Sequence, residues 1–130
     1  MIYVDSSMVV AILLREIQSP KWSARFKTVK FYSSRLLEAE VLAALRREKL
    51  PLSEFDDHAR MIYWIAPERS LKPEVTKVLE YQYLRGADLW HVACALYIFG
   101  NSTGVEFCSL DKIQRAAAKA CGFRLLPEKL

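Results

Sequence analysis

The chain begins with a short apolar segment that ends in an acid and continues directly into a helical pattern. Ile2, Tyr3 and Val4 are typical strand residues. Asp5 stands where this strand ends, and Ser6 begins the helical pattern. Asp5 can cap the helix by accepting hydrogen bonds from its first N–H groups. It can also bind a metal ion, because open α/β sheets place their sites at the carboxyl ends of strands. One carboxylate can do both, since it has about four acceptor sites.

Strands alternate with helices along the rest of the chain. Apolar runs with few breaks predict strands at residues 2–4, 30–34, 105–110 and 123–126. Helical periodicity predicts helices at residues 6–15, 19–28, 34–49, 53–65, 74–84, 88–99 and 112–121, with a loop at 100–104. The block from residue 51 to 84 therefore reads as helical throughout. This order predicts an α/β fold with a mostly parallel central sheet in a single domain, residues 1–130.

Composition excludes several classes of protein. The apolar share of 52% is too high for a disordered chain. No apolar run reaches the roughly 18 residues that a membrane span needs. No basic segment precedes the short N-terminal apolar stretch, so we expect no signal peptide and a cytoplasmic protein without membrane contact. The three cysteines, Cys94, Cys108 and Cys121, show no paired spacing and predict reduced, buried thiols.

Four acids are expected to come together at one edge of the sheet. Asp5 and Asp111 both follow strands, and the carboxyl ends of parallel strands share an edge. Asp88 begins a helix on its inward face. An acid early in the helix at 34–49 completes the group, and periodicity alone leaves both Glu38 and Glu40 open. His91, one turn after Asp88, is more simply a packing or hydrogen-bonding residue.

Clustered carboxylates favour a hard divalent cation. Like charges repel and raise one another's pKa unless a cation offsets them. Mg²⁺ prefers oxygen ligands and can activate water against a phosphodiester. The chain lacks a Ser-His-Asp order, a P-loop and a dinucleotide-binding glycine pattern. Its net charge of +4 permits nucleic-acid binding. Phosphodiester hydrolysis suits these features better than acyl or hydride transfer.

The chain resembles the PIN-domain ribonucleases, and specifically the VapC-type toxins of toxin–antitoxin pairs, over nearly its whole length. Four segments carry the resemblance: Val4-Asp5-Ser6-Ser7, residues 34–47, residues 84–96 and Cys108-Ser109-Leu110-Asp111. In the second, the family has alanine or valine before its glutamate, which assigns the role to Glu40 and makes Glu38 incidental. In the third, written D-A-x-H in the family, Leu89 replaces the alanine. Residues 117–127 are similar to the family's closing helix and strand.

The resemblance implies a PIN-like three-layer sandwich, with helices on both faces of the sheet, and an Mg²⁺- or Mn²⁺-dependent endoribonuclease. Asp5, Glu40, Asp88 and Asp111 would be the catalytic acids and hold the metal directly or through water. Ser7 and Ser109 would support them by hydrogen bonds. The family also implies an RNA substrate, a homodimer and a VapB-type antitoxin partner. Two alternatives remain open: a PIN nuclease of RNA processing without an antitoxin, and a non-catalytic PIN-like module that binds RNA or protein.

Overall fold

The computed structural model describes residues 1–17, 19–100 and 104–129, and within them the chain forms a five-stranded sheet. The strands are β1 (Ile2–Val4), β2 (Phe31–Ser34), β3 (Ile62–Ile65), β4 (Glu106–Cys108) and β5 (Arg124–Leu126). All are parallel, in the order β3-β2-β1-β4-β5. The predicted α/β fold is confirmed, and the sheet is wholly parallel rather than mostly so.

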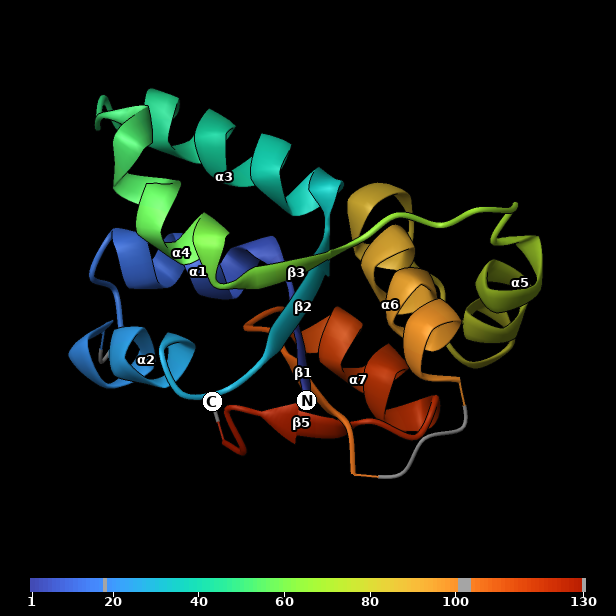
Figure 1. The fold of residues 1–130 in the computed structure, drawn as a ribbon. Helices are drawn as coiled ribbons and strands as arrows, with labels where there is room; N and C mark the ends of the chain where they lie inside the picture. The colour runs from blue at the N-terminus through green and yellow to red at the C-terminus, as the bar shows by residue number, and fades with distance from the viewer. Residues whose placement is uncertain (18, 101–103, 130) are drawn as a thin grey trace.

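Helices cover both faces of this sheet (Figure 1). The helices in the described residues are α1 (Ser6–Leu13), α2 (Ser19–Phe26), α3 (Arg35–Arg47), α4 (Asp56–Arg60), α5 (Lys72–Tyr81), α6 (Gly86–Phe99) and α7 (Lys112–Ala120), with a short 3₁₀ helix, η1 (Leu52–Phe55). One face packs against α1, α2 and α3, and the other against α6 and α7, with α5 packed on α6 (Figure 1). These helices and the sheet form three layers.

Alternating strand residues build two separate hydrophobic cores. Ile2 and Val4 of the central strand face α1 to α3, whereas Tyr3 faces α6 and α7. Phe107 of β4 stacks on the Tyr3 ring with centroids 5.3 Å apart. Because both faces of β1 are fully buried, the strand needs apolar residues at every position, as its sequence has.

The register of the sheet brings the strand ends together. Val4 pairs with Cys108, and the Asp5 N–H donates to the Cys108 carbonyl at 3.1 Å. The residues that follow β1 and β4 therefore lie side by side at the carboxyl edge. Asp5 and Ser109 are the first of them.

Strand β3 corrects the prediction of a helix at 53–65 and of a wholly helical block at 51–84. The chain turns through η1 and α4 and then extends at Ile62–Ile65, which pairs with all four residues of β2. Phe55, Ala59 and Ile62 have helical spacing, which hides the change of structure. Ile, Tyr and Trp at 62–65 are strand residues, and pairing with β2 decides the outcome.

Three further expectations concern the loop, the thiols and the membrane. Residues 101–103 of the loop predicted at 100–104 lie outside the described residues. All three cysteines are free; Cys94 and Cys108 are buried as predicted, and Cys121 is half-buried. In the described part of the chain, no helix is both long enough and apolar enough to span a membrane.

Candidate active site

Asp5 is a buried carboxylate held by hydrogen bonds on both oxygens. Oδ1 accepts from the Ser7 hydroxyl at 2.7 Å and from the Met8 N–H at 3.3 Å, so Asp5 caps α1 as one interpretation predicted. Oδ2 faces the Ser109 hydroxyl at 3.0 Å. Only 2% of the residue is exposed, and this burial raises the pKa of Asp5 to about 6 against the opposing effect of its hydrogen bonds.

Asp111 lies two residues beyond Ser109, where β4 turns into α7. Its Oδ1 accepts from the Gln114 N–H at 2.7 Å and caps the helix. The Asp111 N–H donates to the Ser109 oxygen at 3.0 Å. Ser7 also accepts from the Leu110 N–H at 3.0 Å while it donates to Asp5. The two serines predicted to support the acids therefore tie the end of β1 to the turn after β4.

Glu40 reaches the site through a histidine. Its Oε1 lies 2.7 Å from His91 Nε2, and His91 Nδ1 lies 2.8 Å from the Tyr3 hydroxyl. An ionised carboxylate only accepts, so Nε2–H donates to Glu40, and in a neutral imidazole Nδ1 then accepts from Tyr3. His91 is 1% exposed. The histidine that sequence reasoning treated as a packing or hydrogen-bonding residue thus holds one of the predicted acids.

Glu38 lies outside this arrangement. Its carboxylate pairs with Arg35 at 2.9 Å, and 41% of its side chain is exposed, against 27% for Glu40. Exposed pairs of this kind contribute little to stability. The structure thus separates the two glutamates that periodicity left open, with Glu40 turned toward the other acids.

Asp88 lies in the first turn of α6 and is partly buried. Burial raises the pKa of Asp88, and the charges of Asp111 and Glu40 raise it further, while His91 acts in the opposite direction. Asp88 therefore lies in the field of acids from α3 and from the turn before α7.

Sequence reasoning missed Gln114, which connects these parts. Its side chain is fully buried in α7. Nε2 donates to the Asp88 carbonyl at 3.1 Å, and Oε1 accepts from the Ser109 hydroxyl at 2.7 Å. A polar residue on the same face as the buried Ala117 and Ala118 was the available signal.

A single hydrogen-bonded network therefore joins the elements that carry all four predicted acids. It runs from Glu40 through His91 to α6, from Asp88 through Gln114 to Ser109, and from Ser109 to Asp5 and Asp111. The atoms available here as metal ligands are carboxylate oxygens, the type of ligand that Mg²⁺ prefers.

Direct coordination by three residues is not available in this conformation. Across residues 1–17, 19–100 and 104–129, no three His, Cys, Asp or Glu side chains lie close enough to hold a metal ion. An ion here would keep water molecules between itself and some of the acids. Mg²⁺ commonly binds in this way, with one or two direct carboxylates.

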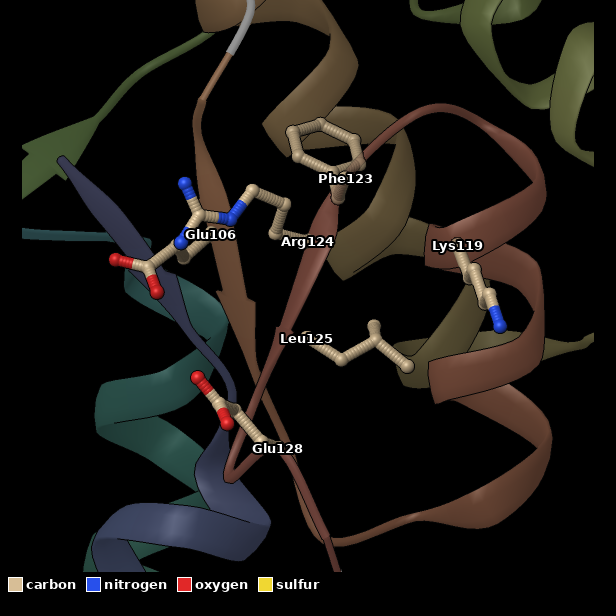
Figure 2. Close-up of a pocket in the computed structure, with 6 residues that line it drawn as sticks. All are labelled: Glu106, Lys119, Phe123, Arg124, Leu125 and Glu128. Carbon is tan, nitrogen blue, oxygen red and sulfur yellow. The ribbon is translucent and has the colours of Figure 1, made fainter.

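One pocket of the described residues lies away from the four acids (Figure 2). A cavity of about 350 Å³ is lined by Glu106, Lys119, Phe123, Arg124, Leu125 and Glu128. Glu106 and Arg124 are the first residues of β4 and β5, so this pocket is near the amino ends of the strands. The four acids lie at or near the carboxyl ends, and none of them lines it.

Comparisons with known protein families, with curated proteins and with solved structures found no match to this chain. Its functional assignment therefore rests on the motifs of the sequence and on the geometry of the site.

Proposed function

We propose that the protein is a divalent-metal-dependent endoribonuclease whose metal-binding carboxylates are Asp5, Glu40, Asp88 and Asp111. The observation that carries the proposal is the hydrogen-bonded network that joins the elements bearing these acids at one edge of the sheet. Such a concentration of negative charge is unfavourable in isolation: burial raises the pKa of Asp88, and the charges of Asp111 and Glu40 raise it further. A bound divalent cation would offset this repulsion.

The acids have separate parts in this proposal. Glu40, Asp88 and Asp111 provide carboxylates near solvent, where a cation and its waters can enter. Asp5 is the buried member of the group, and hydrogen bonds from Ser7 and Ser109 orient its carboxylate. Bound Mg²⁺, or Mn²⁺ in its place, supplies an activated water and offsets charge on the phosphate. His91 keeps the Glu40 carboxylate in place.

The biological setting follows from the resemblance in the sequence. The four motifs support a VapC-type toxin that acts on RNA in the cytoplasm, forms a homodimer and is inhibited by a VapB-type antitoxin. A PIN nuclease of RNA processing is the alternative within the same enzyme class. A small antitoxin gene beside the gene for this chain would favour the toxin.

One observation favours a second candidate, a non-catalytic PIN-like module that binds RNA or protein. In the described part of the chain, the acids are not packed closely enough for three of them to coordinate an ion together. Such a module would bind RNA with its acids intact and leave the RNA uncut, with or without added metal.

The two neighbouring glutamates of α3 provide a matched test. Glu40→Gln removes a charge that faces the site, and Glu38→Gln removes one from the exposed pair with Arg35. With Mg²⁺ and a structured RNA, we expect Glu40→Gln to lower the cleavage rate at least about tenfold, because it removes a proposed metal ligand and loss of even an outer contact typically costs about 10- to 100-fold. Glu38→Gln should cleave like the unaltered protein. Equal losses in both variants, or the reverse order, would contradict the assignment.

A further inference from the structure

Gln114 is a fully buried amide on the inner face of α7, which also carries the buried Arg115. Its neighbours on that face, Ala117 and Ala118, are buried as well. An amide in such a place is unfavourable unless both of its ends are hydrogen bonded. Both ends are: one contacts the first turn of α6, and the other contacts the turn after β4.

The partners of Gln114 determine how its amide is oriented. The Asp88 carbonyl can only accept, so the amide nitrogen must face it. The amide oxygen then faces Ser109, whose hydroxyl can donate to it at 2.7 Å. This leaves the Ser109 oxygen to accept from the Asp111 N–H at 3.0 Å.

The single hydroxyl hydrogen of Ser109 therefore has two possible acceptors. Both Gln114 Oε1, at 2.7 Å, and Asp5 Oδ2, at 3.0 Å, lie within reach of the hydroxyl. Gln114 competes with Asp5 for that hydrogen. It also sets the distance between the start of α6, which carries Asp88, and the turn that carries Asp111.

We propose that Gln114 is a positioning residue of the candidate active site. It acts through Ser109 and the Asp88 backbone, and it holds Asp5, Asp88 and Asp111 in the arrangement that binds the cation. The inference rests on the proposed function and deepens it. Neither the sequence motifs nor the resemblance assigned a role to this residue.

Two variants of α7 separate positioning from simple support of the fold. Gln114→Met keeps the length of the side chain and removes both of its hydrogen bonds. Ala118→Gly, at a buried position of the same helix, weakens the helix without touching any polar atom of the site. Gln114→Leu is a second apolar variant, should Gln114→Met fail to fold.

The readouts are Mn²⁺ binding followed by electron paramagnetic resonance, RNA cleavage in Mg²⁺, and the melting temperature. Outer contacts of metal sites typically change affinity or activity by about 10- to 100-fold. We expect Gln114→Met to weaken Mn²⁺ binding or cleavage by about tenfold or more, with a melting temperature at or above that of the Ala118→Gly protein. Ala118→Gly should lose melting temperature and keep both other properties.

Two results would overturn the inference and are distinguishable. If Gln114→Met and Gln114→Leu bind Mn²⁺ and cleave RNA like the unaltered protein, the positioning role is wrong and the nuclease stands. If the unaltered protein neither binds Mn²⁺ nor cleaves RNA, the proposed function is wrong and this inference fails with it.

Discussion

At the scale of single residues, Asp5 combines burial with a charge at neutral pH. Burial raises the pKa of Asp5 from 3.8 to about 6 in the folded protein. Between these values the folded state binds more protons than the unfolded state. The contribution of this group to the free energy of unfolding is therefore greatest below pH 3.8 and is lost as the pH rises through 6.

The first prediction concerns Asp5→Asn in metal-free buffer. A rise in pKa from 3.8 to about 6 corresponds to about 3 kcal/mol at neutral pH. We expect the difference in unfolding free energy, variant minus unaltered protein, to increase by up to about 3 kcal/mol between about pH 4 and about pH 7. Urea unfolding at several pH values measures it. A difference that stays constant over this range would contradict the buried charge.

The second prediction concerns the buried hydroxyl of Tyr3. Tyr3→Phe removes the hydroxyl that pairs with His91 Nδ1 and leaves that nitrogen unpaired in the core. An unsatisfied buried polar group costs about 1–3 kcal/mol, so the variant should lose that much stability in urea unfolding. Tyr63→Phe, at an exposed ring on β3, is the control and should stay within about 0.5 kcal/mol. Equal effects in the two variants would show that the Tyr3–His91 bond contributes nothing.

At the scale of elements, local patterns predicted most of the helices and strands correctly. The prediction of a helix at residues 53–65 was wrong. Strands β1, β2, β4 and β5 were predicted because each is a short apolar run next to a helical pattern. Strand β3 was missed because its Ile62 continues the helical spacing of Phe55 and Ala59. Only pairing with β2, which local sequence does not contain, makes this segment extended.

In the candidate site too, local sequence predicted some residues and missed others. Asp5 and Asp111 were recognised because both stand at strand ends, a feature of local sequence. Gln114 and the hydrogen bond from His91 to Glu40 were not, because their partners are 5 to 51 residues away along the chain. Such contacts depend on how α3, α6 and α7 pack against one another.

The third prediction tests how α7 holds the strand ends. Arg115 is buried and donates to the carbonyls of Ser109, at 2.9 Å, and Pro127, at 2.6 Å. Hydrogen bonds to charged groups contribute about 1.5–3 kcal/mol each, so we expect Arg115→Ala to lose at least about 2 kcal/mol in urea unfolding. Arg115→Lys should lose less, because its ammonium can still reach one of the two carbonyls. A loss below about 0.5 kcal/mol for Arg115→Ala would contradict this role.

At the scale of the whole molecule, charge is distributed unevenly. The chain has 19 basic and 15 acidic residues, and four of those acids belong to the candidate site. The remainder is therefore more basic than the net charge of +4 suggests. A basic excess outside the candidate site suits binding of a polyanion such as RNA.

The fourth prediction follows from that distribution. Binding of single-stranded RNA to the Asp5→Asn protein should weaken steeply as salt rises, with a logarithmic slope of about −0.7 for each phosphate contacted. Fluorescence anisotropy with labelled RNA at several salt concentrations measures it. An affinity that does not change with salt would show that the basic excess takes no part in RNA binding.

Cleavage of structured RNA by the purified protein tests the central claim most directly. The protein is compared in Mg²⁺, in Mn²⁺ and in EDTA, with Asp5→Asn alongside. We predict cutting in either metal, none in EDTA, and loss of cutting in the variant while its fold persists. Intact RNA under every condition, with no metal bound, would contradict the nuclease and favour the non-catalytic module.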